Sequence, residues 1–122
     1  MNQLRFTLLP DGSSDRVLLH VISWTLRQHL PGVAIQPEFA DLRILPQVPK
    51  TLEERIKTSV DLYPCNILFI HRDAEREDRN HRVAEIDKAL AKIKNFSTPV
   101  VRVIPVRMSE AWLLFDEHAI RT

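Results

Sequence analysis

Acidic side chains follow three separate apolar segments of this 122-residue chain, close to the point where each segment ends. They are Asp11 and Asp15 after residues 4–10, Asp73 and Glu75 with His71 after residues 65–70, and Glu110 with Ser109 after residues 100–106. Open α/β sheets bind ligands outside the carboxyl ends of their parallel strands. If the three segments are such strands, the sequence predicts a cluster of carboxylates at one edge of a sheet.

The chemistry expected of such a cluster is divalent-metal chemistry. Carboxylates that lie together repel one another, which costs free energy unless a cation neutralises them. Mg²⁺ and Mn²⁺ prefer oxygen ligands, and either ion can hold a phosphodiester and activate water for its hydrolysis. We therefore expect Mg²⁺ or Mn²⁺ as the cofactor of a site at this edge.

Each of these polar residues also has an ordinary structural explanation. Asp11 suits a turn, and Asp15 and Glu110 each suit the first turn of a helix. His71 suits a hydrogen-bonded position at the end of a buried strand, and residues 71–79 suit a solvated loop. The coincidence of the acidic residues at one predicted edge favours a site; no single residue does so alone.

Arginines lie among the acidic residues and have two interpretations. Arginine side chains can hold substrate phosphates, but arginines interleaved with acids also form surface ion pairs of little energetic value. The predicted phosphate-binding residues are Arg72, Arg76 and Arg107.

Hydrophobic periodicity predicts the elements that would position these residues. Strands are expected at residues 4–10, 65–70 and 100–106, an edge strand or irregular connection at 33–45, and helices at about 17–30, 52–63, 79–95 and 110–121. This alternation predicts an α/β fold with a mainly parallel sheet and helices on both faces, in a single domain over residues 1–122. The last predicted helix reaches the end of the sequence with no closing strand, so we expect more chain to follow.

Composition excludes several classes of site. The net charge of +1, from 17 basic and 16 acidic residues, gives no overall attraction to nucleic acid or membranes. Gly12 and Gly32 are the two glycines, too few for a Walker loop or a dinucleotide-binding turn. Cys65 is the single cysteine, which excludes an internal disulfide and a cysteine-built zinc site, and we interpret it as a packing residue. Without a long apolar segment, no membrane association and a cytoplasmic location are expected.

The order of these motifs resembles the Toprim domain, the metal-binding α/β module of topoisomerases, primases and overcoming-lysogenisation-defect nucleases. "DGSSD" stands where Toprim proteins commonly carry Glu-Gly-x-x-Asp/Glu, and "HRDAE" stands where they carry Asp-x-Asp after a later strand. "SEAWLLFD" closely matches the Glu-Ala-Trp-Leu-Leu segment, followed by Asp, of a bacterial domain-of-unknown-function family with Toprim-like architecture, and it is the most specific of the three. The resemblance covers nearly the whole chain.

This resemblance implies a metal-dependent phosphodiester hydrolase, a nuclease component that acts on nucleic acid, with a bacterial defence or mobile-element system as its expected setting. Asp11 would replace the family's acid/base or metal-binding glutamate. Asp73 would form the metal pair with Glu75 or with His71, because the Asp-x-Asp motif can be aligned in two ways. Glu110 would be a third catalytic residue, and Asp116 a further family position.

Two other functions fit the same residues. A catalytically inactive Toprim-like module could bind a protein partner such as an ATPase, which a histidine in place of the first Asp-x-Asp aspartate and the near-neutral net charge favour. A phosphoacceptor domain resembling response-regulator receivers would use Asp73 to accept phosphate. The sequence lacks a lysine in the matching place after a later strand, so this third function is the least favoured.

Overall fold

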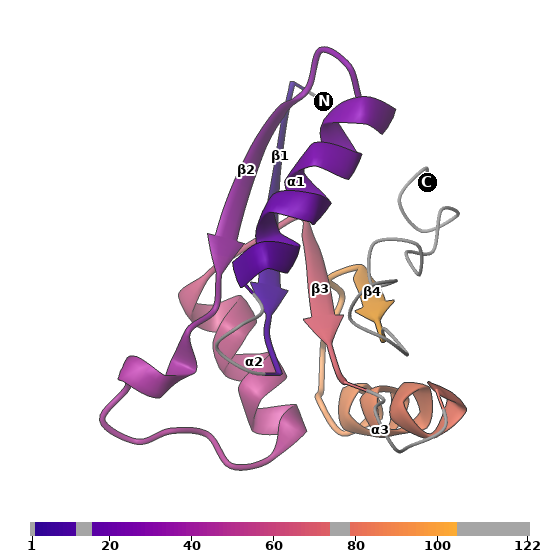
Figure 1. Cartoon of the computed structure of the whole chain (residues 1–122). Helices are drawn as coiled ribbons and strands as arrows, with labels where there is room; N and C mark the ends of the chain where they lie inside the picture. The colour runs from indigo at the N-terminus through magenta and orange to yellow at the C-terminus, as the bar shows by residue number, and fades with distance from the viewer. Residues whose placement is uncertain (1, 12–15, 74–78, 105–122) are drawn as a thin grey trace.

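A four-stranded sheet forms the centre of the computed structural model, which describes residues 2–11, 16–73 and 79–104. The strands are β1 (Gln3–Leu9), β2 (Ala34–Phe39), β3 (Ile67–His71) and β4 (Val100–Val103). They lie in the order β2-β1-β3-β4, and every neighbouring pair is parallel (Figure 1). The predicted α/β fold with a parallel sheet is confirmed.

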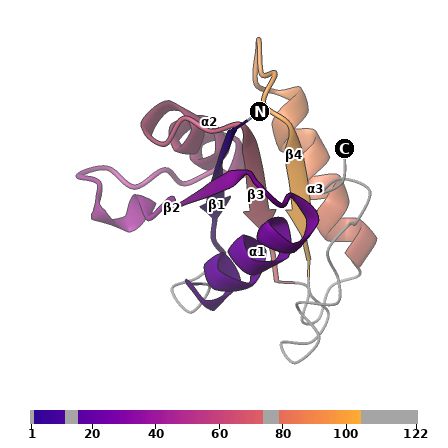
Figure 2. The same ribbon diagram turned by 90° about the horizontal axis from the view of Figure 1, so that it is seen from above.

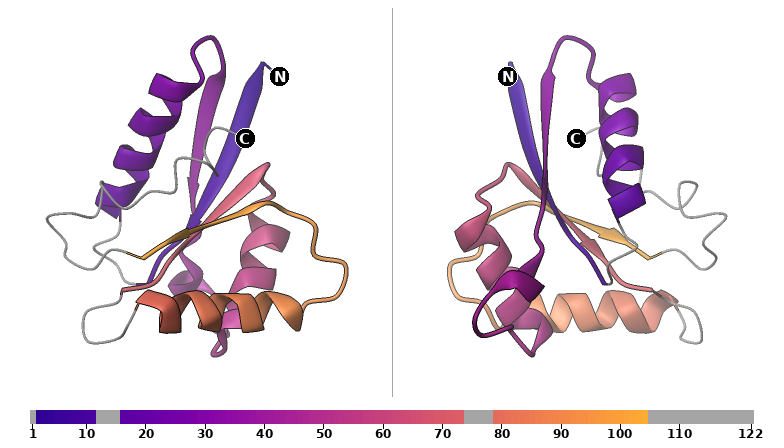
Figure 3. Two further views of the ribbon diagram at one scale, coloured as in Figure 1. Left: turned by 90° about the vertical axis from the view of Figure 1, so that its right-hand side faces the viewer. Right: turned by 60° about the vertical axis from the view of Figure 1, so that its left-hand side comes forward.

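Helices cover both faces of this sheet, as the sequence predicts. Within the described residues these are α1 (Arg16–His29), α2 (Leu52–Leu62) and α3 (Arg79–Ala91), with a short 3₁₀ turn, η2 (Leu42–Ile44), after β2. Figures 2 and 3 show the sheet between α1 on one side and α2 with α3 on the other.

The core is divided into two layers because successive side chains of a strand point to opposite faces. On the α1 side, Phe6 and Phe69 meet edge to face with ring centroids 5.4 Å apart, and Ile22 of α1 belongs to the same buried cluster. On the other side, Ile70 shares a buried cluster with Ile86 of α3. β3 therefore contributes to both layers, which explains its unbroken apolar sequence.

The direction in which the chain travels across the sheet reverses between β1 and β3. From β1 the chain passes through α1 to β2 at one edge, whereas from β3 it passes through α3 to β4 at the other edge. The segments that leave β1 and β3 thus diverge to opposite faces. In open α/β sheets such a switch point opens a crevice at the carboxyl ends of the two strands, where ligands bind.

Several predicted boundaries need correction. The helix predicted to run to residue 95 ends at Ala91, because the N–H groups of Lys92 and Ile93 bond to carbonyls three residues back and Asn95 has a positive φ of 61°. The central strand begins at Ile67, two residues later than predicted, and includes His71.

The two outer strands lie where the sequence predicts them. The edge strand predicted within residues 33–45 is confirmed as β2, and Pro37 is tolerated there because an edge strand pairs on one side alone. β4 ends at Val103, before the predicted limit at 106. The helix predicted at 110–121 lies outside the described residues.

Candidate functional site

Two of the predicted acidic residues meet at the switch point of the sheet. Asp11 follows β1, and Asp73 follows β3, the neighbouring strand. The backbone N–H of Asp73 donates a hydrogen bond of 2.9 Å to Oδ2 of Asp11. The structure therefore brings together two residues 62 positions apart, at the edge where the sequence predicts a carboxylate cluster.

Arg72 links this pair of strand ends to α3. Its Nη1 donates to Oδ1 of Asp11 at 3.1 Å, and its Nη2 donates to Oε2 of Glu85 at 3.0 Å. The Arg72 side chain is 17% exposed, and its backbone N–H donates to the carbonyl of Val103 in β4. Arg72 is predicted from the sequence to hold substrate phosphate; the structure gives it contacts that orient Asp11.

A second arginine fixes the backbone beside Asp73. Nε of Arg82, on α3, donates to the carbonyl of Asp73 at 3.0 Å, and its Nη1 lies 2.6 Å from Oε1 of Glu85. Glu85 thus accepts hydrogen bonds from both Arg72 and Arg82. The result is a network of charge-assisted hydrogen bonds that holds the ends of β1 and β3 and the first half of α3 in one arrangement.

The remaining predicted site residues divide into two groups. His71 is the last residue of β3, is 3% exposed and pairs with Val103 in the β4 register, so the structure places it inside the sheet. The others lie outside the described residues, and their predicted roles stay predictions: Asp15, Glu75, Arg76, Arg107, Glu110 and Asp116.

Of the predicted metal ligands, Asp11, His71 and Asp73 lie within the described residues and Glu75 lies outside them. Mg²⁺ is usually held by one or two carboxylates, with water and substrate phosphate completing its coordination. Within residues 2–11, 16–73 and 79–104, no group of three or more His, Cys, Asp or Glu side chains is arranged to hold a metal. The contact between the two aspartates runs through the backbone N–H of Asp73, and the second Asp11 oxygen accepts from Arg72, so a cation there would share Asp11 with these two donors.

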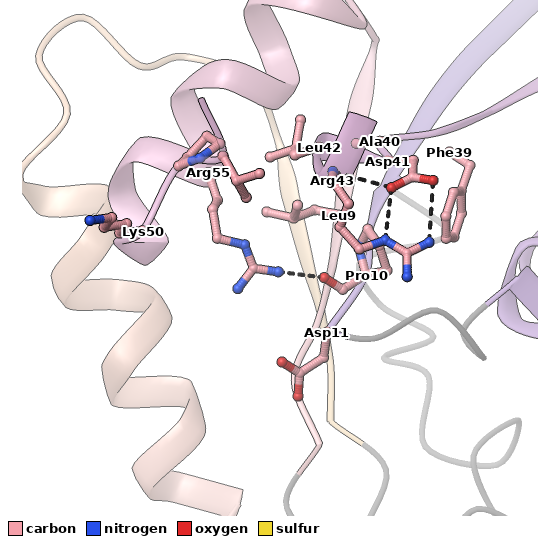
Figure 4. A pocket seen from close by; sticks show the side chains of 12 residues that line it. Leu9, Pro10, Asp11, Phe39, Ala40, Asp41, Leu42, Arg43, Lys50 and Arg55 are labelled. Carbon is pink, nitrogen blue, oxygen red and sulfur yellow. Dashed lines mark hydrogen bonds and ion pairs between the residues drawn. The ribbon is translucent and has the colours of Figure 1, made fainter. Parts of the chain in front are cut away.

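A cavity of about 260 Å³ lies beside Asp11, at the carboxyl ends of β1 and β2. Figure 4 shows Arg43 from η2, with Lys50 and Arg55, among the side chains that line it. Sequence analysis did not identify these three cations. The available signal is their position: all three lie between the end of the edge strand and the first turn of the next helix, a segment that starts at the carboxyl edge of the sheet.

Arg55 reaches from α2 to the end of β1. Its Nη2 donates to the carbonyl of Pro10 at 2.7 Å. Partial burial lowers the pKa of Arg55, the positive charge of Arg72 lowers it further, and the carboxylate of Asp11 opposes both effects. The guanidinium is thus partly desolvated and lies under the opposing influence of Arg72 and Asp11.

Cys65 lies away from this site, just before β3. Burial raises the pKa of its thiol above the usual value, which disfavours the reactive thiolate. This supports the interpretation of Cys65 as a packing residue.

The comparisons with known proteins identify no family for this chain. No family model matches the chain, and no curated protein is significantly similar to it. None of the helices in the described part of the chain has the length and apolarity needed to cross a bilayer.

Proposed function

We propose that this protein is a metal-dependent phosphodiester hydrolase, a Toprim-like nuclease component that acts on nucleic acid. The observation that carries the proposal is the contact between Asp11 and Asp73 at the switch point of the sheet. The motifs "DGSSD" and "HRDAE", on which the Toprim resemblance depends, contain these two residues. The proposed setting is a bacterial defence or mobile-element system.

In this proposal, each residue has a separate role. Asp11 and Asp73 would hold Mg²⁺ or Mn²⁺, and the bound cation would supply neutralisation of phosphate charge and a more acidic water. Arg72 and Arg82 fix the Asp11 carboxylate and the Asp73 backbone, so that little reorganisation is needed when the cation and substrate bind. Arg76, Glu75 and Glu110 are proposed to complete the phosphate and metal contacts.

A cleavage assay tests this function. The full chain is incubated with single- and double-stranded DNA and RNA in Mg²⁺ or Mn²⁺, beside Asp73→Ala and the control Asp61→Ala. Asp61 is an exposed carboxylate near the end of α2, at the opposite end of the strands. We expect Asp73→Ala to reduce cleavage by about 100-fold or more, and Asp61→Ala to leave it within about twofold. Equal cleavage by all three proteins, or none by the wild type, would contradict the proposal.

A second candidate is a catalytically inactive Toprim-like module that binds a protein partner such as an ATPase. The exposed apolar side chains of α1 favour it: Trp24 is 63% and Val17 66% exposed. Large exposed apolar side chains grouped on one surface often mark interaction sites. This candidate predicts that wild type and Asp73→Ala behave alike in every metal-dependent assay.

A further inference from the structure

The cavity beside Asp11 differs in chemistry from the carboxylate pair. Its volume of about 260 Å³ is just below the range of about 300–1,000 Å³ typical of pockets for drug-sized ligands, so it suits a small group such as a phosphate with part of a sugar. Pro10 and Asp11 line it on one side, and Lys50 and Arg55 line it on the other. Asp11 therefore belongs both to the lining of this cavity and to the proposed metal site.

The charges around the cavity are unequally compensated. Asp41 accepts hydrogen bonds from both Nε and Nη2 of Arg43, at 3.0 and 3.3 Å, and Asp11 is paired with Arg72. Among the residues that the structure describes, no carboxylate forms an ion pair with Lys50 or Arg55. The carboxylates of the cavity thus already form ion pairs, whereas Lys50 and Arg55 form none with the described carboxylates.

Of these two cations, Arg55 gives the stronger indication of a bound anion. It is partly buried, its position is fixed by the 2.7 Å bond to Pro10, and a partly desolvated guanidinium costs free energy that a bound anion would recover. The bond to Pro10 uses Nη2, so other N–H groups of the planar guanidinium can still donate to a ligand. Their arrangement matches the oxygens of a phosphate. Lys50 also lines the cavity, and in the view of Figure 4 it lies on the other side of Arg55 from Asp11.

We infer that this cavity is a phosphate-binding subsite, in which Arg55 and Lys50 hold a backbone phosphate of the nucleic-acid strand next to the bond that is cleaved. The ligand class rests on the proposed function. The cavity lies at the ends of β1 and β2, and Asp73 lies at the end of β3, so the two sites are separated by about one or two strand spacings of ~4.8 Å. Electropositive grooves that follow a strand's backbone commonly use successive phosphates in this way.

Binding without metal separates this inference from the hydrolase function. The probe is a fluorescent thymidine hexanucleotide, titrated in EDTA and followed by anisotropy at several salt concentrations. The variants are Arg55→Met and Lys50→Ala, with Arg27→Met, an exposed arginine on α1, as the matched control. Lys50 is also exposed, so its variant is expected to fold even if Arg55→Met does not; circular dichroism checks both.

We expect Arg55→Met to weaken binding about 5- to 10-fold, Lys50→Ala about 3-fold, and each to reduce the salt dependence by about 0.7 in the log–log slope. Arg27→Met should bind within about twofold of wild type. Thymidine 5′-monophosphate should compete poorly, because it spans one phosphate alone.

Three results would overturn the inference: no binding by the wild type, equal affinities for Arg55→Met and Arg27→Met, or a mononucleotide that binds as tightly as the hexanucleotide. Loss of binding in the cavity variants, together with no cleavage by any protein, would support the subsite and reject the hydrolase. Cleavage that needs Asp73 and is unchanged in Arg55→Met and Lys50→Ala would support the hydrolase and reject the subsite.

Discussion

At the scale of single residues, Arg72 connects the ends of three strands. Its guanidinium contacts Asp11 after β1 and Glu85 on α3, its own position follows β3, and its backbone N–H bonds to Val103 of β4. Asp11 and Glu85 are both partly buried; Arg72 compensates the charge of Asp11 and shares the compensation of Glu85 with Arg82. This residue therefore supports both the fold and the orientation of the proposed metal ligand.

We predict that Arg72→Met lowers the free energy of unfolding by about 1–3 kcal/mol, because it leaves two partly buried carboxylates without this partner. Arg102→Met is the matched control: Arg102 pairs with the half-exposed Asp87, and its loss should cost less than about 1 kcal/mol. Urea unfolding curves of the three proteins make the comparison. Equal losses of stability in Arg72→Met and Arg102→Met would show that the ion pairs of Arg72 contribute no more than an exposed surface ion pair.

At the scale of elements, the helices and strands follow from sequence patterns, whereas their ends depend on local hydrogen bonds. Four neighbouring apolar residues predict β3, and the spacing of Leu52, Ile56 and Val60 predicts α2. The early end of α3 was not predicted, because the apolar spacing continues through Ile93 after the regular helical hydrogen bonds have stopped.

The start of α2 offers a test at this scale. Thr51 is the N-cap residue, and its side-chain oxygen accepts from the N–H of Glu54 at 3.2 Å. Thr51→Ala should destabilise the protein by about 1 kcal/mol, whereas Thr58→Ala, within the same helix, should cost less because Ala is the stronger helix former. Thermal unfolding measures both. A smaller loss for Thr51→Ala than for Thr58→Ala would contradict the assigned cap.

At the scale of the whole molecule, the parallel sheet and its reversal of direction bring Asp11 and Asp73 together. The sequence predicts this meeting because each aspartate closely follows an apolar strand, and the rule for strand ends needs no side-chain detail. It does not predict the cavity of Lys50 and Arg55, since that depends on how the segment after β2 folds back against the end of β1. Long-range contacts of this kind leave no periodic signal.

The proposed hydrolase function requires Asp11 and Asp73, at this switch point, to bind a divalent cation. The most direct measurement is calorimetric titration of Mn²⁺ and of Mg²⁺ into the full chain, beside Asp73→Ala and the control Asp61→Ala. We predict binding by the wild type and by Asp61→Ala, and an affinity reduced about 10-fold or more in Asp73→Ala. No binding by the wild type, or equal binding by Asp73→Ala, would contradict the account and favour the partner-binding module.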